Sequence, residues 1–506
     1  MTAQPDRIRS IAVVGGGSAG WIAASVLSRA LAGIGCKITV VESADIGRIG
    51  VGEATIPAIL ELLRFLAIDE TDFVRHVGAT YKLGIKFHDW RSLGHTYWHP
   101  FGVFGTPIAR RPFFHAWHKA RAEGLAPRFN DFSLCAAMGD ELKFRFPDAK
   151  AGGPAAGVRY ALHFDANRVA HYLRSYAERQ GVVRLDRTVN GATQRDDGFL
   201  EELVFSDGSR LAADLFIDCS GFRGVLIEQS LKTGYIPWDQ WLPCDRAVAV
   251  ESEMASPRTP YTGAHARPAG WRWRIPLQAR AGNGYVYASA HIGDDAAFED
   301  LSAELGERLL SPPRFLRFVT GRRKLLWNRN CVALGLASGF IEPLESTNIQ
   351  LAINGVYNLL DHFPDRGFDP ANIAAYNEEL IAEVEHVRDF IILHYCLTER
   401  DDAPMWRDLR TMSLPASLEG EIERYKATGR VRRAPRDLFT DVSWFYILDG
   451  MGVTPRAYDP LVDTVPAERL AAVMADLARA HAAALAAAPS HDSWFEAGRP
   501  LALATR

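Results

Sequence analysis

Three closely spaced glycines near the N-terminus have the spacing that a dinucleotide phosphate needs. Gly15, Gly17 and Gly20 form a G-x-G-x-x-G pattern that encloses Ser18 and Ala19, between an apolar stretch and an alanine-rich stretch. Glycines let backbone N–H groups approach a pyrophosphate, and the start of the following helix supplies partial positive charge. The pattern therefore predicts a strand, a phosphate-binding turn and a helix.

A carboxylate and two later stretches extend this predicted site. Glu42 ends the next apolar stretch, where its carboxylate can accept hydrogen bonds from ribose hydroxyls. Small residues follow two further apolar stretches, at 218–221, which begins with Asp218, and at 335–339, which begins with Gly335. Small residues at strand ends permit close approach of a ring or a phosphate. Because the sequence has one such glycine pattern, an extended FAD is favoured over a separate nicotinamide domain.

A lysine at position 82 interrupts an apolar alternation. Apolar residues alternate with polar or small ones along residues 81–88, which predicts a strand with Lys82 on the face opposite the apolar one. By this pattern alone Lys82 is a solvated surface residue, and so is Lys86 on the same face. Local periodicity therefore gives Lys82 no special role.

Glu345 lies in a nearly uncharged stretch that precedes an apolar helical pattern. This position predicts partial burial, and burial of an unpaired carboxylate would be costly, so a lysine partner would relieve that cost. A structural role beside a helix N-cap stays open, because Ser346 and Thr347 also cap helices well.

Four further segments identify a family. They are G-V-G-E-A-T-I-P at 50–57, A-T-Y-K-L-G-I at 79–85, W-R-W-R-I-P at 271–276 and G-F-I-E-P-L-E-S-T-N-I at 339–349. Together with the glycine pattern, and in this order, they resemble the flavin-dependent tryptophan halogenase family from about residue 8 to residue 465. The resemblance implies an oxidoreductase that halogenates an aromatic ring.

The reaction implied by the resemblance has two stages. Reduced FAD, supplied by a separate NAD(P)H-dependent flavin reductase, reacts with oxygen to give a flavin hydroperoxide, and chloride or bromide then yields hypohalous acid. The acid passes through a tunnel to the family lysine, which matches Lys82 and either forms a haloamine or holds the acid by a hydrogen bond. The family glutamate matches Glu345, whose carboxylate could stabilise the cationic ring and accept its proton.

The matched segments also imply the other site residues. Backbone amides of Thr347 and Asn348 hold the halide, as expected for an anion at a helix N-terminus. Trp271, Trp273 and Ser346 line the tunnel, although core packing also explains the two tryptophans. The expected cofactor-binding set is Gly15, Gly17, Ser18, Ala19, Gly20, Glu42, Ala54, Asp218, Gly335 and Leu344.

The substrate pocket departs from the tryptophan enzymes of the family. His99 and Phe101 match an H-x-F segment that lines the indole pocket, where Phe101 could stack on an aromatic ring. Trp444 and Phe445 stand where free-tryptophan halogenases use tyrosines to grip the amino acid, and the gripping glutamate has no clear match. A zwitterion left unpaired in a pocket binds poorly. The resemblance thus points to a branch without the tryptophan clamp and to an indole-like substrate.

Two other functions share some of these features. An FAD-dependent aromatic hydroxylase has the same nucleotide-binding fold, but it would not need Lys82. A non-catalytic flavin-binding protein could keep the fold, but it would have no reason to retain both Lys82 and Glu345.

Composition excludes several classes of protein. The chain has 506 residues, 48% hydrophobic and 23% charged, with a formal net charge of −4. No basic block suggests nucleic acid, no apolar stretch is long enough to cross a membrane, and the cysteine spacing suggests no metal site. We expect a cytoplasmic enzyme with a small aromatic substrate; a homodimer is compatible with the sequence.

The elements that must position these residues indicate an α/β fold. Apolar stretches predict buried strands at 9–14, 37–41, 200–205, 215–219 and 331–336, with helices at 21–32, 56–66 and 349–362. Antiparallel strands are expected at 248–254, 271–277 and 284–292. We predict a Rossmann-type, flavin monooxygenase-like FAD-binding domain at 1–365, with inserted antiparallel segments at about 91–149 and 226–319. Residues 366–506 are expected to form a mainly helical region that covers the substrate and ends in a helix at 467–487.

Overall fold

The computed structural model describes residues 6–44, 52–125, 127–150, 152–254, 256–305, 309–432 and 437–496. Gly50 and Val51, which begin one of the family segments, lie outside these ranges. The chain divides into two compact units, each assembled from three segments. Unit 1 is Met1–Gly78, Phe164–Asp245 and Arg317–Glu385, and unit 2 is Ala79–His163, Arg246–Leu316 and His386–Arg506.

A six-stranded sheet forms the centre of unit 1, in the order β20-β21-β12-β1-β2-β8. Strand β1 (Ser10–Val14) runs parallel to β2 (Lys37–Glu42) and to β12 (Leu215–Asp218), with Ala12 opposite Thr39 and Phe216. Isoleucine and valine fill these strands because both faces of a parallel sheet are buried. The remaining strands of the sheet are β8 (Val183–Asp186), β20 (Trp327–Asn328) and β21 (Cys331–Ala333).

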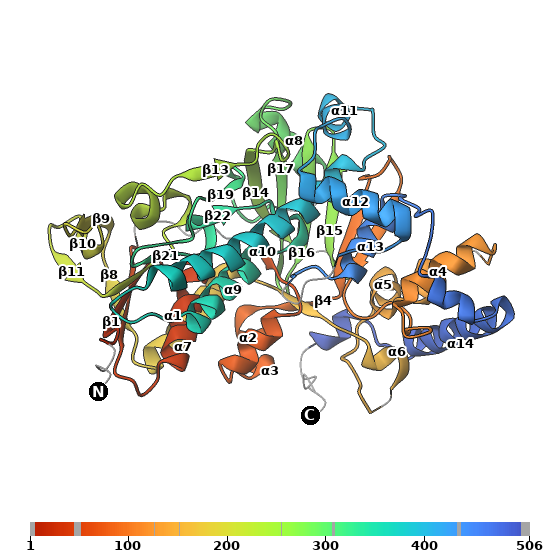
Figure 1. The fold of residues 1–506 in the computed structure, drawn as a ribbon, viewed down its shortest axis with the longest axis horizontal. Helices are drawn as coiled ribbons and strands as arrows, with labels where there is room; N and C mark the ends of the chain where they lie inside the picture. Colours follow the sequence, from red (N-terminus) through yellow and green to blue (C-terminus); the bar gives the residue numbers. More distant parts are fainter. Residues whose placement is uncertain are drawn as a thin grey trace. The chain divides into compact units, whose positions relative to one another are not determined.

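Helices and smaller sheets complete unit 1. Helix α1 (Ser18–Ala30) connects β1 to β2 and contacts α7 (Ala166–Arg179) and α9 (Asn348–Asp361) (Figure 1). A meander of β9 (Val189–Gln194), β10 (Leu200–Phe205) and β11 (Arg210–Ala212) shares a buried apolar cluster with the main sheet. The other elements are β3 (Glu53–Ala54), α2 (Ile59–Phe65), α3 (Glu70–Val77), β13 (Tyr235–Pro237), β19 (Gly321–Arg323) and β22 (Gly339–Phe340).

Unit 2 is built on a seven-stranded sheet in the order β18-β14-β17-β16-β15-β5-β6. The predicted antiparallel strands are present as β14 (Arg246–Glu253), β16 (Gly270–Pro276) and β17 (Arg280–Tyr287). The prediction missed β15 (Thr262–Arg267), which is antiparallel to β16 and joined to it by a short turn. It also gave the wrong neighbour for β14, which pairs with β17 and not with β16. The edge strands are β6 (Thr96–Pro100) and β18 (Arg314–Arg317).

The strand predicted over residues 81–88 is in fact two strands in two sheets. Strand β4 (Thr80–Lys82) pairs with β7 (Ala161–Phe164), whereas β5 (Gly84–His88) joins the seven-stranded sheet. At the break, the N–H of Leu83 donates to the carbonyl of Pro260 over 2.7 Å, and its carbonyl accepts from Phe101 N–H over 2.7 Å. These partners are distant in sequence, so the local alternation could not reveal the break.

Helices make up most of the C-terminal part of unit 2, as predicted. Helix α10 (Pro370–Cys396) begins in unit 1 and enters unit 2 at His386. The other helices of unit 2 are α4 (Phe113–Ala122), α5 (Leu134–Asp140), α6 (Gly153–Ala156), α8 (Asp294–Leu305), α11 (Pro404–Arg410), α12 (Ala416–Thr428), α13 (Asp441–Gly450) and α14 (Ala467–Ala486). None of the helices within the described ranges has the length and apolarity that a membrane crossing requires. The predicted α/β class is confirmed.

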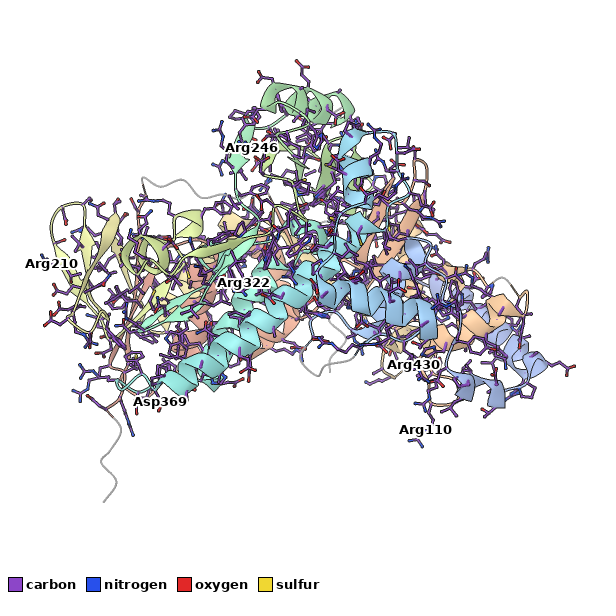
Figure 2. All side chains as sticks on the ribbon, turned by 45° about the horizontal axis from the view of Figure 1, so that its top comes forward. Arg110, Arg210, Arg246, Arg322, Asp369 and Arg430 are labelled. Atoms are coloured by element: carbon purple, nitrogen blue, oxygen red, sulfur yellow. The ribbon has the colours of Figure 1, made fainter. Side chains whose placement is uncertain are left out.

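The charged residues labelled in Figure 2 differ in their exposure. Arg210 in unit 1 and Arg430 in unit 2 are exposed. Arg322, by contrast, is only 8% exposed and forms an ion pair with Glu385 at 2.6 Å. A buried guanidinium needs such a partner, because removing its hydration is costly.

Candidate active site

The glycine turn of unit 1 packs too closely for side chains at two positions. Gly15 has a φ of 117°, and a Cβ there would lie 2.1 Å from the carbonyl oxygen of Cys219. A Cβ on Gly20 would lie 1.9 Å from the carbonyl oxygen of Gly15. These two glycines therefore allow the turn to close against the end of β12 and the helix to pack against the turn, as predicted.

Gly17, the second glycine of the pattern, faces open space. A Cβ on Gly17 would meet no atom within 4 Å, and Gly17 precedes the first residue of α1, Ser18. The helix starts three residues earlier than Trp21, where the sequence placed it, so Ser18 and Ala19 belong to its first turn. Gly335 lies against Ala19, since a Cβ on Gly335 would be 2.7 Å from the Cβ of Ala19. Free N–H groups and open space at a helix N-terminus suit the pyrophosphate of a dinucleotide.

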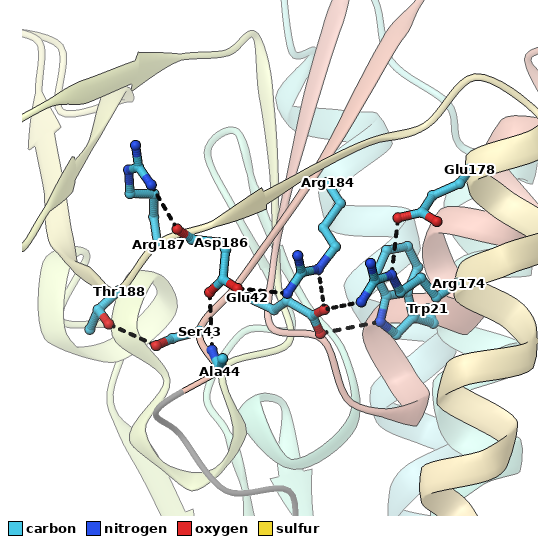
Figure 3. Close-up of polar contacts among 10 residues, drawn as sticks. All are labelled: Trp21, Glu42, Ser43, Ala44, Arg174, Glu178, Arg184, Asp186, Arg187 and Thr188. Atoms are coloured by element: carbon cyan, nitrogen blue, oxygen red, sulfur yellow. Dashed lines mark hydrogen bonds and ion pairs between the residues drawn. The ribbon is translucent and has the colours of Figure 1, made fainter.

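Glu42 at the end of β2 is held by side chains from three elements (Figure 3). Arg184 on β8 donates from Nε to Oε1 over 2.6 Å, and Arg174 on α7 lies 3.6 Å from the same oxygen. Trp21 on α1 donates from Nε1 to Oε2 over 3.4 Å. The Glu42 carboxylate also lies against the glycine turn, because a Cβ on Gly16 would overlap Oε2. The sequence identified Glu42 but not Arg174 and Arg184, because these two arginines come close to Glu42 only when the chain folds.

The remaining predicted cofactor residues take different positions. The Asp218 carboxylate accepts two backbone hydrogen bonds of 2.8 Å, from Leu226 and Ile227, and further ones from Ser220. Asp218 thus shapes the turn after β12. Ala54 and Leu344 are both buried in unit 1.

Lys82 is completely buried in unit 2. Its Nζ lies 5.3 Å from the centroid of the Phe101 ring, within the range of a cation–π contact. The expectation of a solvated lysine is therefore wrong for Lys82, because its strand ends at a break between two sheets. Lys86 does have an accessible side chain, 20% exposed, and pairs with Asp140 at 2.7 Å.

Close approach of two strands brings the H-x-F segment to Lys82. A Cβ on Gly84 would lie 2.6 Å from the carbonyl oxygen of His99 and 2.7 Å from Cα of Pro100. Only glycine at this position lets β5 and β6 lie so close together. Phe101, which follows β6, is tied to Leu83 by its backbone N–H. Phe101 thus lies beside Lys82, and the backbone of His99 lies against Gly84, two residues from Lys82.

Aromatic rings from three helical or loop segments surround His99. Its ring centroid lies 5.5 Å from that of Phe390, 5.9 Å from that of Phe439 and 6.0 Å from that of Tyr446. Sequence patterns do not single out these three residues, because the residues meet only through folding. Trp444 packs against Phe390 at 5.4 Å.

Phe445 packs against two phenylalanines of unit 2, Phe104 and Phe114. Its ring stacks on Phe114 at 5.1 Å and packs against Phe104 at 5.0 Å, and it is fully buried. The structure therefore places Tyr446, the next residue of α13, beside His99 and places Phe445 in the aromatic core.

The two tryptophans of β16 also differ in their surroundings. Trp271 is 1% exposed and packs against Trp90 at 6.2 Å between ring centroids. Trp273 is half-buried and lies across Gly284, where a Cβ would be 2.0 Å from its ring. Core packing accounts for the position of Trp271, and the tunnel role of both residues stays a prediction.

Glu345 and its neighbours form the turn before α9 in unit 1. Glu345 is 1% exposed, which agrees with the predicted burial, and Thr347 is fully buried. Ser346 has a φ of 61°, which reverses the chain direction before Asn348 begins the helix. The first N–H groups of α9 have no partner within the helix, and this is the property that the predicted halide site requires.

Comparison with known proteins decides the family. A family model described as "Tryptophan halogenase" matches residues 10–467. The chain belongs to the tryptophan halogenase family. Tryptophan 6-halogenase ThaL from Streptomyces albogriseolus is 34% identical, over 89% of this chain and 91% of its own.

Two solved structures of halogenases are similar to this chain over nearly its whole length. Xcc4156, a flavin-dependent halogenase from Xanthomonas campestris, is 41% identical with a TM-score of 0.92, covering 97% of this chain and 98% of its own. BrvH, a flavin-dependent halogenase from Brevundimonas sp. BAL3, is 42% identical with a TM-score of 0.93, covering 97% and 99%. The protein is thus a flavin-dependent halogenase, an oxidoreductase that halogenates aromatic compounds, and its family implies FAD as cofactor and a halide as co-substrate.

Proposed function

We propose that this halogenase transfers chlorine or bromine to an electron-rich, indole-like ring. Lys82 would deliver the halogen, and Glu345 would accept the proton that the ring loses. The observation that carries the proposal is the complete burial of Lys82 with its Nζ 5.3 Å from the Phe101 ring. A lysine is almost never buried without a specific reason. An aromatic side chain at this distance can stack on an aromatic substrate and present it to the amine.

The cofactor, when bound and reduced, supplies hypohalous acid from oxygen and a halide. The Lys82 amine either takes the halogen, forming an N–halogen bond as the O–halogen bond breaks and water leaves, or holds the acid by a hydrogen bond. The ring then attacks the halogen with a π-electron pair. A C–halogen bond forms as the N–halogen bond, or in the second case the O–halogen bond of the acid, breaks and leaves its electron pair on nitrogen or oxygen. Burial of Lys82 excludes water, so that the halogen is directed to the ring.

Glu345 would receive the proton that the ring loses. A carboxylate in a buried position stabilises a neighbouring cation more strongly than one in water, and Glu345 is 1% exposed. Thr347 and Asn348 would hold the halide at the start of α9, where backbone N–H groups and the helix dipole favour an anion. A separate flavin reductase would supply the reduced cofactor.

The surroundings of His99 support a substrate without an amino-acid group. The ring contacts of His99 are with Phe390, Phe439 and Tyr446, and these suit a flat aromatic molecule. A free amino acid would need polar partners for both of its charges, since an unpaired charge binds poorly in such a pocket. We therefore place the protein in a branch without the tryptophan clamp.

Mass spectrometry of the products tests both parts of the proposal. Indole and tryptophan are each incubated with the enzyme, FAD, a flavin reductase, NADH and either chloride or bromide. We expect halogenated indole to exceed halogenated tryptophan, because the rings around His99 carry a single hydroxyl, that of Tyr446, and no charged group that could pair with both charges of tryptophan. A large excess of halogenated tryptophan would refute the substrate assignment.

Lys82→Ala and Lys86→Ala make a matched pair for the catalytic assignment. We expect Lys82→Ala to lose at least about a hundredfold in halogenation, with unchanged FAD binding. Lys86→Ala removes a lysine that pairs with Asp140 near the surface, and it should retain most of the activity. Equal halogenation by Lys82→Ala and the wild type would show that free hypohalous acid does the chemistry.

A further inference from the structure

A buried histidine lies on the same strand face as Lys82. Strands β4 and β7 are antiparallel, with Thr80 opposite His163 and Lys82 opposite Ala161. Side chains two residues apart share a strand face, so Thr80, Lys82 and His163 all project from the same side. All three are completely buried.

His163 takes part in a chain of three hydrogen bonds. The Thr80 hydroxyl donates to the carbonyl of Pro276 over 2.6 Å. His163 Nδ1 lies 3.3 Å from Thr80 Oγ1, and His163 Nε2 lies 2.8 Å from Thr262 Oγ1. The chain thus connects β4, β7, β15 and the end of β16.

The protons in this chain can be placed in only one way when His163 is neutral. A carbonyl cannot donate, so the single hydroxyl proton of Thr80 points to Pro276. His163 Nδ1 must then carry the proton that it shares with Thr80, and Nε2 accepts from the hydroxyl of Thr262. Burial holds the pKa of His163 well below its ordinary value, with Lys82 and His491 lowering it further, so the ring is neutral.

We propose that His163 is a positioning residue for Lys82, fixing the strand face from which the lysine reaches the substrate. The neutral imidazole joins Thr80, two residues from Lys82, to Thr262 on β15. Small errors in the position of a reacting group can cost large factors in rate. This inference rests on the proposed role of Lys82.

Substitutions at both ends of the bond between His163 and Thr262 test the inference. His163→Leu removes both ring nitrogens, whereas Thr262→Val removes only the donor to Nε2 and keeps the side-chain shape. Thr262→Ser restores the hydroxyl. His481→Asn is the control, because His481 is a buried histidine of α14 whose Nδ1 bonds to the carbonyl of Leu477 in the same helix over 2.9 Å.

The measurement is the fraction of oxidised halide that reaches the substrate, with the remainder trapped by a dissolved scavenger of hypohalous acid. We expect His163→Leu and Thr262→Val to lower this fraction and kcat by about tenfold or more, with unchanged KM and FAD affinity. Thr262→Ser and His481→Asn should stay near the wild type.

The outcomes separate the two hypotheses. If Lys82→Ala delivers halogen as well as the wild type does, the proposed function fails and the role of His163 fails with it. If Lys82→Ala is inactive but folded Thr262→Val delivers normally, the inference about His163 alone is overturned. An equal loss in His481→Asn would overturn it too, because His163 would then contribute only general packing.

Discussion

At the scale of single residues, burial separates two lysines that the strand pattern makes alike. Lys82 is completely buried, whereas Lys86 keeps a partly exposed side chain and an ion pair with Asp140. Removing an ammonium from water is costly, so the position of Lys82 lowers stability unless specific partners offset the loss. Proteins tolerate such costs chiefly at functional sites, which is why burial directs attention to Lys82 and not to Lys86.

Gly17 offers a residue-scale test of the nucleotide site. Gly17→Ala adds a methyl group where no protein atom lies within 4 Å, so we expect an unchanged melting temperature. If the pyrophosphate lies against this turn, the methyl group should weaken FAD binding by at least about tenfold. Flavin fluorescence titration and thermal unfolding provide the two measurements.

Gly15→Ala is the contrasting variant. Its Cβ would lie 2.1 Å from the carbonyl of Cys219 at a φ of 117°, so it should lose stability as well as FAD. Normal FAD affinity in Gly17→Ala would show that the cofactor does not lie against this turn.

At the scale of elements, the break between β4 and β5 creates the position of Lys82. If residues 81–88 formed one continuous strand, Lys82 would lie on the same face of the same sheet as Lys86. Instead Leu83 bonds to Pro260 and Phe101, and β4 pairs with β7. The close contact of β5 with β6 at Gly84 then holds Phe101 near Lys82.

Gly84→Ala tests this arrangement of strands. The added Cβ would lie 2.6 Å from the carbonyl of His99 and would push β6 away, so we expect a loss of about 1–3 kcal/mol in the free energy of unfolding. Halogenation should fall as Phe101 moves from Lys82. Chemical denaturation measures the first effect and product analysis the second.

Gly420→Ala is the matched control. Gly420 lies within α12, exposed and with no atom within 4 Å of a Cβ, so alanine should raise stability by about 0.5–1 kcal/mol through helix propensity. A Gly84→Ala protein as stable as the wild type would mean that β5 and β6 can separate without cost.

At the scale of the whole molecule, each unit depends on segments that are far apart in the sequence. In unit 1, Asn377 on α10 accepts hydrogen bonds from the backbone of Leu326 and Trp327, and Glu385 pairs with the buried Arg322. Asn377 and Glu385 both lie beyond residue 365, where the predicted FAD-binding domain ends. That boundary stays a prediction.

Expression of residues 1–365 alone tests the boundary. The fragment lacks Asn377 and Glu385, so Arg322 would lose its partner and two buried backbone amides would lose theirs. We expect the fragment not to fold cooperatively or to bind FAD, as judged by circular dichroism and flavin titration. A folded, FAD-binding fragment would support the boundary.

Buried histidines make the stability of unit 2 depend on pH. His118 bonds to the hydroxyl of Tyr425 over 2.9 Å, and burial, with help from Arg121 and His115, lowers its pKa to about 3. The unfolded chain binds a proton near pH 6.5, whereas the folded chain does not. The free energy of unfolding should therefore fall as the pH drops below 6.5, by up to about 1.4 kcal/mol per unit for this group.

A histidine variant isolates this contribution. His118→Gln can keep a hydrogen bond to Tyr425 but does not titrate, so stability should fall less steeply between pH 6.5 and pH 5, by about 2 kcal/mol in total. His76→Gln, at an exposed site, should leave the slope unchanged. The same slope in the wild type and His118→Gln would contradict the prediction.

Local features of the sequence were enough to predict the family and the βαβ start, and they named candidate site residues. The glycine pattern, Glu42 and the W-x-W-x-I-P segment are local, and their chemistry depends on spacing along the chain. The bounds of β10 and α9 also followed closely from local apolar periodicity.

The side chains that surround these residues could be known only from the folded chain. It buried Lys82, brought Arg174 and Arg184 to Glu42, and placed His163 and Tyr446 in their clusters. Each of these contacts joins residues far apart in the chain. Local periodicity reports which face of a strand is apolar, but it cannot report where a strand leaves one sheet for another.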